Sequence, residues 1–566
     1  MFGKSSDITY QNMIPAEFRR MKPTDVVITT FTLDGTVLDK VLGDLLMGGA
    51  LATMFRERAD ENKDNIRVYC DHGQFIKDGK FGSVIRKVGP QKNLRFHPKV
   101  ILIRYEEGDD KNQVKYFLSV SSSNISASSS VEAYFATSGE VGETEGNGKG
   151  VAEFLKNNIP RSDANKRMID ELEKTTFQAE GCSAIEFLSA DEVNKKLFDN
   201  DGLLIVSPYL NIGALKDNAE KIAGIYSKKD SFAGITEEIA QYFYTKLYVN
   251  CDKTVHAKVY CYKKGGKTHW IIGSSNATLN GFYRKKDEEK EYCGNTEFNV
   301  YFTTKEDDYE KFQNILWHEH TSTQKNNNNE DICLFKKYEP VNTENDETDA
   351  HKKLDNLIYS VINNLSFSDG YIEKANYRVK IHLDDKFWEK YDKKDNEIHV
   401  AVSVQEDEKK QEFKKEESSI TLTSQKTFYY VFVSFRFNSI EQTRLIPINW
   451  KNEQIIKERA ESERKEAEIY AREREKEHFR GGSQYRSRSE TTREAGQKTS
   501  AQTSREERFE KLMIYCRNKN IDKNALKELL ETLALETPDT TDAKKFYLAL
   551  SEACDTYKNG DVKDGK

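Results

Sequence analysis

The sequence predicts an α/β fold of two similar halves, followed by a small antiparallel β domain and a C-terminal helical module. A His-x-Lys pair on an apolar run, then a small-residue turn ending in Asn, occurs over 96–124 and again over 255–276. In both halves apolar runs alternate with helix-like stretches, as expected of sheets covered by helices. Beyond residue 315 apolar residues alternate with period two, which is typical of antiparallel strands.

The two halves are predicted to span residues 1–170 and 171–318 and to repeat one order of elements: a strand, a helix and further strands. The strand, glycine and helix are 26–33, Gly35 and 38–46 in the first half, and 203–210, Gly213 and 215–222 in the second. Further strands, 116–120 and 270–272, enter the two small-residue turns. The polar residues of both motifs therefore lie at strand ends.

Each motif places a histidine two residues before a lysine: His97 with Lys99, and His256 with Lys258. Alternate side chains of a strand share a face, so each histidine should point the same way as its lysine. Asn124 and Asn276 end the two turns. The turns also carry four serines with suitable hydroxyls: Ser122, Ser123, Ser274 and Ser275.

These residue types suit the chemistry of a phosphodiester. Cleavage without a metal needs a nucleophile, a proton donor for the leaving oxygen, and positive charge around the phosphoryl oxygens. Two imidazoles that titrate near neutrality can divide the first two roles. The lysines, the asparagine amides and the serines can hold the phosphoryl oxygens. The repeat thus predicts one composite phosphodiester site.

The paired motifs resemble the phospholipase D superfamily over roughly residues 20–315. That family joins two α/β halves across a shared active site. Its usual HKD motif has four residues after the lysine and then an Asp, but here those positions hold Arg104 and Lys263. The pattern His-x-Lys followed by Asn is more similar to the tyrosyl-DNA phosphodiesterase branch and its related nucleases.

The resemblance implies roles for individual residues. His97 would be the nucleophile that forms a phosphohistidine, and His256 the general acid that later activates water. This order follows the family's habit, because the residues alone do not distinguish the two imidazoles. Lys99, Lys258, Asn124 and Asn276 would clamp the phosphate, while Glu132 and Glu297 would orient the histidine rings. The family needs no metal or other cofactor, and none is expected here.

Ordinary structural roles compete with these assignments. A single strand histidine is usually a hydrogen-bonded structural group, and either glutamate suits an ion pair; duplication with matched Lys and Asn favours catalysis. No Gly-x-Ser-x-Gly elbow marks a nucleophilic serine. His318 and His320 would suit a metal ion, but no convincing third ligand accompanies them.

The composition narrows the class of protein. The 566 residues suggest three or four domains. Eight cysteines without a CxxC pair indicate a reducing compartment, and no long apolar run or signal region is present, so a cytoplasmic protein with no membrane association is expected. The net charge of −7 argues against a chain-wide nucleic-acid footprint. Basic clusters interleaved with aromatic residues nevertheless flank both motifs and predict a channel for a single strand; they are Arg86, Lys87, Lys92 and Arg95, and Lys263, Lys264, Lys267, Arg284, Lys285 and Lys286.

The remaining chain is predicted to consist of modules on tethers. In order these are a linker (319–351), an antiparallel β-rich accessory domain (352–450), a solvated charged helix (451–480), a low-complexity disordered linker (481–504) and a small helical module (505–566). No catalytic constellation occurs in them. We expect them to bind a protein partner, and hypothesise a helicase or ATPase within a repair or anti-phage defence complex.

The sequence therefore predicts a metal-independent phosphodiesterase, a nuclease or DNA-end-processing enzyme, with DNA favoured over RNA. Two alternatives stay open: a lipid-acting phospholipase D-like enzyme, and a catalytically inactive nucleic-acid-binding platform. Because both halves lie in one chain, a monomer can complete the site, and a homodimer is equally compatible.

Overall fold

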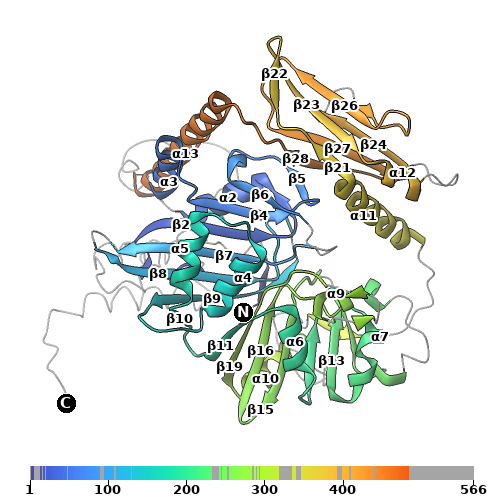
Figure 1. Cartoon of the computed structure of the whole chain (residues 1–566). Coiled ribbons are helices and arrows are strands. Elements are labelled where there is room, and N and C mark those ends of the chain that lie inside the picture. Colours follow the sequence, from blue (N-terminus) through green and yellow to red (C-terminus); the bar gives the residue numbers. More distant parts are fainter. Residues whose placement is uncertain are drawn as a thin grey trace, which may run out of the picture. The chain divides into compact units, whose positions relative to one another are not determined.

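The computed structural model (Figure 1) divides into two compact units, Met1–His478 and Phe479–Lys566. It describes residues 2–4, 13–15, 17–18, 21–46, 49–89, 95–107, 110–128, 130–232, 241–243, 245–251, 254–282, 286–287, 290–291, 294–317, 334–338, 346–391, 398–406, 410–437 and 440–483. Of the linker predicted over 481–504, residues 481–483 belong to helix α13 (Glu453–Ser483), and the rest lies outside the described residues, as does the helical module over 505–566. No helix of the described part is both long and apolar enough to cross a membrane.

The first sheet has the order β1-β9-β8-β7-β2-β4-β6, with β10 paired to β9. Its strands are β1 (Phe2–Lys4), β2 (Lys22–Thr30), β4 (Ile66–Asp71), β6 (Ile85–Val88), β7 (Val100–Glu107), β8 (Asp110–Ser121), β9 (Val131–Val141) and β10 (Thr175–Gln178). A short pair, β3 (Leu33–Asp34) and β5 (Phe75–Lys77), lies beside it. The helices are α2 (Gly35–Leu45), α3 (Ala50–Glu61), η2 (Gly82–Val84), α4 (Lys149–Asn158) and α5 (Asp163–Leu172).

The second sheet has the order β11-β19-β16-β15-β12-β13-β14-β20. Its strands are β11 (Ser183–Leu188), β12 (Leu203–Val206), β13 (Ile222–Ser227), β14 (Leu247–Asn250), β15 (Val259–Lys264), β16 (Lys267–Gly273), β19 (Asn299–Lys305) and β20 (Phe335–Lys337). Its helices are α6 (Ala190–Leu197), α7 (Ile212–Leu215), η3 (Lys216–Lys221), η4 (Lys229–Phe232), α9 (Leu279–Phe282) and α10 (Asp308–Leu316), and β17 (Lys286–Asp287) pairs with β18 (Lys290–Glu291).

The two sheets share one topology. In each, the first core strand (β2 or β12) pairs in parallel with the next strand, which pairs in parallel with a third. On its other side it pairs antiparallel with the strand that follows the His-x-Lys motif, and two more antiparallel strands continue the sheet. The architecture is thus mixed α/β, with the two motifs at equivalent places in two sheets.

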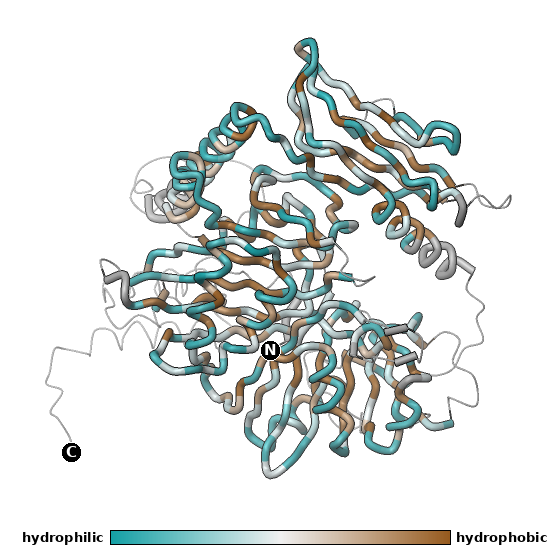
Figure 2. The backbone as a smooth tube through the Cα atoms, viewed as in Figure 1, coloured by the Kyte–Doolittle hydropathy of each residue, from teal (hydrophilic) through white to brown (hydrophobic). Residues whose placement is uncertain are grey.

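One hydrophobic core lies between the two sheets and contains side chains of both, together with α4, α5 and α10. A second core lies between the first sheet and α2 and α3, and a third covers the other face of the second sheet. Strands buried on both faces explain the nearly continuous apolar runs of β2 and β12. In Figure 2 brown, hydrophobic stretches lie mainly along the strands of the sheets.

Local signals explain where the helices begin. The Asp34 carboxylate accepts hydrogen bonds from the backbone N–H groups of Thr36 and Val37, which caps α2. Ser162 caps α5 in the same way, and Ser189 forms a capping box with Glu192 at α6. The predicted boundary at residue 170 falls inside α5, and β10 still belongs to the first sheet, so the halves divide between β10 and β11.

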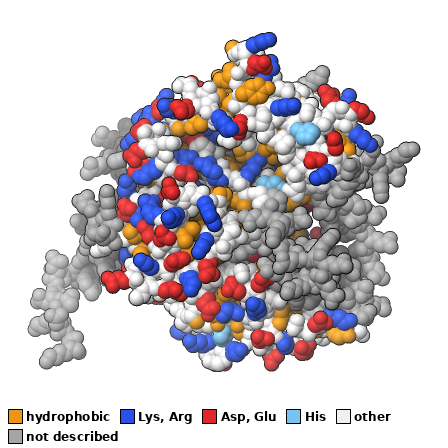
Figure 3. Space-filling model, viewed as in Figure 1, with side chains coloured by type: hydrophobic (Ala, Val, Ile, Leu, Met, Phe, Trp, Pro, Cys, Tyr) orange, Lys and Arg blue, Asp and Glu red, His pale blue; other side chains and the backbone are white. Residues whose placement is uncertain are grey.

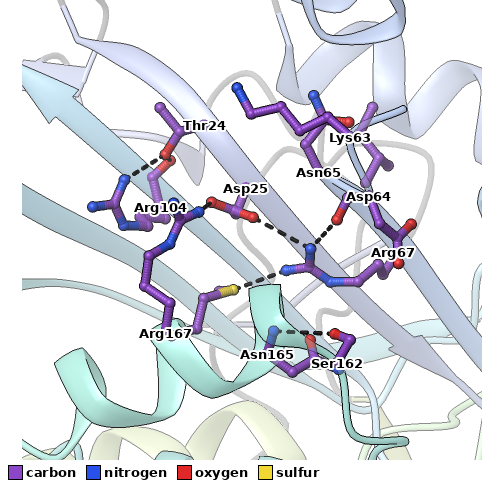
Figure 4. A network of polar contacts seen from close by, with 12 residues as sticks. Thr24, Asp25, Lys63, Asp64, Asn65, Arg67, Arg104, Ser162, Asn165 and Arg167 are labelled. Carbon is purple, nitrogen blue, oxygen red and sulfur yellow. Dashed lines mark hydrogen bonds and ion pairs between the residues drawn. The ribbon is translucent and has the colours of Figure 1, made fainter. Parts of the chain in front are cut away.

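A buried ionic network fixes α5 to the first sheet (Figure 4). The Asp25 carboxylate, on β2, lies 3.2 Å from a nitrogen of Arg67 on β4 and also pairs with Arg167 on α5. Asp25 and Arg67 are fully buried, at 1% and 0% exposure. Nearby, the Arg104 guanidinium pairs with Glu171 of α5 at 2.7 Å. Arg104, which replaces the family's Asp in the first motif, is therefore structural.

Replacing Asp25 by Asn should destabilise the first sheet by about 3 kcal/mol, because it leaves the Arg67 charge buried without a carboxylate. Hydrogen exchange of the β2 and β4 amides in the full chain measures the change. Glu140→Gln is the matched control, since its carboxylate pairs with Lys115 at the surface. Unchanged protection in the Asp25 variant would contradict the assignment.

The segment after the second half differs from the predicted linker. Within 319–351, β20 pairs antiparallel with β14 and completes the second sheet, and α11 (Asp346–Asn364) begins. The strands that follow form two four-stranded antiparallel sheets with a common core. They are β21 (Leu365–Phe367), β22 (Tyr371–Glu373), β23 (Asn376–Leu383) and β26 (Ser419–Ser424), and β24 (Ile398–Ser403), β25 (Gln411–Glu412), β27 (Tyr430–Phe437) and β28 (Ile440–Pro447), with α12 (Asp385–Tyr391) between β23 and β24.

The predicted solvated helix is instead a docked one. α13 (Glu453–Ser483) buries Ala467 completely, and a Cβ on Gly43 of α2 would lie 2.3 Å from the Tyr470 ring. The Glu463 carboxylate, 5% exposed, accepts a hydrogen bond from the Ser83 backbone N–H at 2.8 Å. The many charges of α13 did not indicate this packing, because the apolar face of the helix is narrow and small residues lie at its centre.

Candidate active site

Both His-x-Lys motifs lie in extended segments just before strands β7 and β15, rather than within those strands as predicted. Each segment bridges to the other half of the molecule. Phe96 forms an isolated parallel bridge with Thr296, and Val255 forms one with Val131. The backbone N–H of His97 donates to the carbonyl of Thr296, and that of His256 donates to the carbonyl of Val131. The two histidines are therefore held by the segments that carry the two glutamates.

The histidine–carboxylate contacts cross between the halves. His97 Nδ1 lies 2.9 Å from Glu297 Oε2, and His256 Nδ1 lies 3.1 Å from Glu132 Oε1. Each imidazole thus takes its carboxyl partner from the opposite half. A partner at Nδ1 fixes the ring and leaves Nε2 as the atom that can face a substrate.

The two lysines lie against the histidines. Lys99 Nζ donates to the carbonyl of His97 at 2.8 Å, and Lys258 Nζ donates to the carbonyl of His256 at 2.7 Å. Lys258 Nζ also lies 3.0 Å from His256 Nε2. Both ammonium groups are almost fully buried. Two buried cations beside two imidazoles make a site that attracts an anion.

The lysines and burial shape the titration of the site. Burial, then Lys99, Lys258 and His256, hold the pKa of His97 well below its usual value. Burial and Lys258 lower the pKa of His256 to about 4, although Glu132 opposes them. Both imidazoles are therefore neutral at pH 7 in the free site. An anionic phosphodiester would raise both pKa values toward neutrality.

The two carboxyl groups differ in their surroundings. Burial alone would raise the pKa of Glu132, but the hydrogen bond and charge of His256, with Lys258, lower it to about 2. Hydroxyls of Ser122 and Ser130 also donate to it. Burial raises the pKa of Glu297 to about 8 despite Lys99. Burial therefore favours the protonated form of Glu297, whereas His256 and Lys258 favour the charged form of Glu132.

The turn residues divide into two groups. The Ser122 hydroxyl bonds to Glu132, that of Ser274 to the carbonyl of Phe298, and that of Ser275 to Asn299. All three serines have no exposed surface, so they support the site from behind and do not reach a phosphate as predicted. Ser123 is half-buried and its hydroxyl donates to the Asn124 carbonyl.

The two asparagines occupy equivalent places with different contacts. Asn124 Oδ1 lies 3.5 Å from the backbone nitrogen of Thr32, at the limit of a hydrogen bond. Asn276 is 8% exposed, and its Oδ1 has no hydrogen-bond partner among the described residues. A buried polar atom without a partner is uncommon, so Asn276 Oδ1 is available to bind a substrate.

Sequence reasoning missed the turn that faces each asparagine. Thr30 and Ser207, at the ends of β2 and β12, each accept a hydrogen bond at 3.0 Å from the backbone N–H after the asparagine, in Ile125 and Ala277. Each hydroxyl also donates to the carbonyl two residues on. Aligning the two copies of the strand–turn–Leu segment would have revealed these hydroxyls.

Aromatic side chains on these turns were missed as well. The Phe31 ring lies 4.9 Å from that of His97. In the second half, Tyr209 is 48% exposed, and Lys228 Nζ lies 4.0 Å from its ring centre. The Lys228 charge also helps burial and Lys99 to lower the pKa of Lys258, which places Lys228 close to the buried lysines.

Of the residues named for the predicted basic channel, those whose side chains are described do not line the site together, and Lys92, Arg284 and Lys285 lie outside the described residues. Lys263, Lys264 and Lys267 lie at the β15–β16 turn, at the opposite end of these strands from the motif, and Lys263 pairs with Glu310. Arg86 pairs with Asp64. Arg95 remains near the site, where its charge helps to lower the pKa of His97 after burial and the lysines.

The described residues contain no cluster of His, Cys, Asp or Glu suited to a metal ion. His318 and His320 lie outside the part of the chain that the structure describes. What the site assembles is therefore a set of two imidazoles, two carboxyl groups and two ammonium groups. Such a set of groups can carry out acid–base and nucleophilic chemistry at phosphorus.

A family model described as the NgoFVII restriction endonuclease N-terminal PLD domain matches residues 220–318, which include the second motif. The match confirms the predicted resemblance to the phospholipase D superfamily near its nuclease branch. It also supports the predicted enzyme class, a phospholipase D-like phosphodiesterase or nuclease. The first motif lies outside the matched residues.

Two solved structures are similar in a more distant way. A mutant of yeast tyrosyl-DNA phosphodiesterase 1 shares 12% identity, with a TM-score of 0.36, over 54% of this chain and 89% of its own. The yeast tyrosyl-DNA phosphodiesterase shares 12% identity, with a TM-score of 0.34, over 53% and 87%. No curated protein matches this chain.

Proposed function

We propose that the chain is a metal-independent nuclease or DNA-end-processing phosphodiesterase whose two pseudo-symmetric halves build one site. The crossed contacts carry the proposal, because His97 and His256 each depend on a carboxyl group from the other half. Such contacts bring two imidazoles and two buried ammonium groups to one interface. A structural histidine would not require this duplicated arrangement.

In the proposed reaction His97 Nε2 attacks phosphorus, and the bond to the leaving oxygen breaks as His256 protonates that oxygen. His256 then takes a proton from water, the hydroxide attacks phosphorus, and the phosphorus–nitrogen bond to His97 breaks. Lys99 and Lys258 hold the non-bridging oxygens through both steps. The bound phosphodiester supplies the negative charge that raises the pKa of His256 for its role as acid.

The surroundings support nucleic acid as the substrate. Tyr209 offers an exposed ring next to a cation, and Phe31 lies against His97; such rings stack on bases beside a phosphate. The domain that matches the second half is named for a restriction endonuclease, which supports DNA over RNA. On the face drawn in Figure 3, Lys and Arg are interspersed with Asp and Glu, so attraction to a strand would be local to the site.

A panel of end-labelled single-stranded DNA, duplex DNA, RNA and phosphatidylcholine vesicles, each with and without EDTA, tests the function. We expect cleavage of DNA by the full chain and none by His97→Ala or His256→Ala. Cleavage of the phospholipid alone would select a lipid-acting enzyme. DNA binding without any cleavage would select an inactive platform, and activity lost only with EDTA would overturn the metal-independent chemistry.

We also propose that the accessory domain and the tail connect this nuclease to a protein partner, such as a helicase or ATPase of a cytoplasmic defence complex. The accessory domain holds the segment before His97, which supports a regulatory connection: the Arg95 guanidinium stacks 4.4 Å from the Tyr359 ring of α11. Affinity purification of the chain from its native cells tests this. Recovery without any stoichiometric partner would contradict it.

Tyr209→Ala should raise the KM for single-stranded DNA about tenfold and leave kcat nearly unchanged, because stacking on one ring contributes about 1–3 kcal/mol per base. Steady-state kinetics on a labelled oligonucleotide measure both constants. Tyr242→Ala is the matched control, since Tyr242 is 43% exposed with Lys216 Nζ 4.9 Å from its ring centre. Equal KM values in the two variants would contradict a stacking role for Tyr209.

The pH profile should show an alkaline fall in kcat/KM near pH 8. Burial lowers the pKa of Lys99 to about 8, although Glu297 and Glu132 oppose it. Below this pH the ammonium is charged and attracts the phosphoryl oxygens, and above it the group is neutral and the attraction is lost. The fall in kcat should come at higher pH, because the bound phosphate keeps the ammonium charged. A flat kcat/KM profile to pH 10 would contradict this role.

A further inference from the structure

A pocket with a volume of about 520 Å³ is lined by residues outside the candidate active site. Three parts of the chain line it: α3 with the edge strand β6, the end of β28 with the residues after it, and the first turns of α13. Its lining residues include none of the two motifs or the two glutamates. Pockets of this size between structural layers commonly hold small molecules.

The pocket carries an excess of positive charge. Five cationic side chains line it, Arg58, Lys63, Arg86, Lys87 and Arg459, against one carboxylate, Asp64. Arg58 and Arg86 share that carboxylate, each at 3.0 Å. Lys63 pairs with Glu57, and Arg459 with Glu463. One guanidinium charge and that of Lys87 are therefore left without their own counter-charge, which suits a dianion such as a phosphate.

Lys87 is the clearest sign of a missing ligand. It lies on β6 opposite the buried Cys70 of β4, and the structure gives it no ion pair or hydrogen bond among the described residues. Burial lowers its pKa to about 7. The side chain is half-buried, and a partly desolvated amine without a partner is destabilising unless something compensates it. A bound anion would both pair with this amine and keep it charged.

The opposite wall of the pocket is apolar and aromatic. It consists of Tyr429, Pro447, Ile448, Trp450, Ile455 and Ile456. The Tyr429 ring is covered by the Arg459 guanidinium at 4.4 Å. A ligand that fits must have an anionic end for the cations and a flat, weakly polar body for this wall.

We propose that this pocket binds a small phosphorylated nucleoside, with its phosphates on Lys87, Arg58 and Arg86 and its base against the wall formed by Tyr429 and Ile448. The site is distinct from that of the proposed nuclease reaction and does not depend on it. The ligand would bridge the first half and the accessory domain. Another contact of the accessory domain, that of Tyr359 with Arg95, lies next to the first motif.

Isothermal titration of the full chain with ATP, inorganic phosphate and adenosine tests the proposal. We expect ATP to bind, and phosphate and adenosine each to bind at least tenfold more weakly. Lys87→Met should weaken ATP binding at least tenfold without loss of folding, because a half-buried lysine is replaced by an apolar side chain of similar length. Lys77→Met, an exposed lysine on β5 outside the pocket, is the matched control.

Three results would overturn the proposal. Phosphate binding as tight as that of ATP would reduce the site to an anion site only. If a single-stranded oligonucleotide displaced ATP from the unaltered chain, and its own binding were weakened by Lys87→Met, the pocket would belong to the DNA-binding surface. Equal ATP affinity in the Lys87 variant and the control would place the ligand elsewhere. Because His256→Ala leaves the pocket intact, ATP binding in that variant separates this proposal from the nuclease one.

Discussion

Replacing either His97 or His256 by alanine is expected to lower the rate of phosphodiester cleavage on the order of 10⁴-fold. In the proposed mechanism one imidazole provides the nucleophile and the other the proton, and the buried lysines supply neither. The double variant should lose little more than each single variant, since the two groups act as a unit. Single-turnover kinetics on a labelled oligonucleotide measure all three.

His382→Ala is the matched control, because His382 is exposed on the accessory domain and bonds only to Ser419 in the described structure. It should retain full activity. A single active-site variant with more than a tenth of the normal rate would show that its imidazole is dispensable. Circular dichroism of each variant keeps loss of folding apart from loss of chemistry.

The same variants identify the attacking imidazole. If His97 is the nucleophile, a denaturing quench of His256→Ala at alkaline pH, with a substrate that has a good leaving group, should trap phosphohistidine at residue 97, because the phosphorus–nitrogen bond is stable in alkali. Trapping at residue 256 in the His97 variant would reverse the roles. The burial of Glu297, which favours its protonated form, would then explain the reversal, since the His97–Glu297 pair would supply the acid.

The second large effect concerns the crossed carboxyl groups. Glu297→Gln and Glu132→Gln should each lower kcat on the order of 10³-fold, because an amide holds an imidazole in the wrong tautomer and cannot stabilise its charged form. Each variant should also perturb the histidine of the opposite half: Glu297→Gln that of His97, and Glu132→Gln that of His256. NMR titration of the imidazole C–H signals measures this directly.

The direction of the NMR change tests positioning separately from folding. Glu132 raises the pKa of His256 against burial and Lys258, so its removal should lower that pKa further and leave His97 nearly unaffected. Glu186→Gln, an exposed carboxylate paired with Lys196, is the control and should move neither signal. A variant that shifts only the histidine of its own half would contradict the crossed arrangement.

Much of the fold that carries the candidate site could be predicted from the sequence, because the same motif occurs in both halves. The repeated His-x-Lys and Asn positions predicted the α/β halves and brought His97, His256 and both glutamates to attention. The identity of each glutamate's partner was not accessible. Glu132 is near His97 in sequence, and only the bridges of Val131 to Val255 and of Phe96 to Thr296 reveal that it serves His256.

Other errors had different physical causes. The serines of the turns carry hydroxyls that suit a phosphate, but sequence does not distinguish a hydroxyl that faces a ligand from one that faces a neighbouring carboxylate, as Ser122 does. α13 has so many charges that it read as solvated, whereas its contacts use Ala467 and Tyr470. β20 is three residues long, too short for its alternation to be seen.

The exchange of carboxyl groups between the halves has a consequence for the cell that makes this protein. A ribosome completes the first motif long before it reaches Glu297, and until then the His97 ring lacks the carboxyl group that orients it. In the proposed mechanism, a nascent polypeptide that ends before Glu297 therefore has no complete site with which to cleave DNA. Cleavage by the proposed mechanism would begin only after both halves have been synthesised and have folded together.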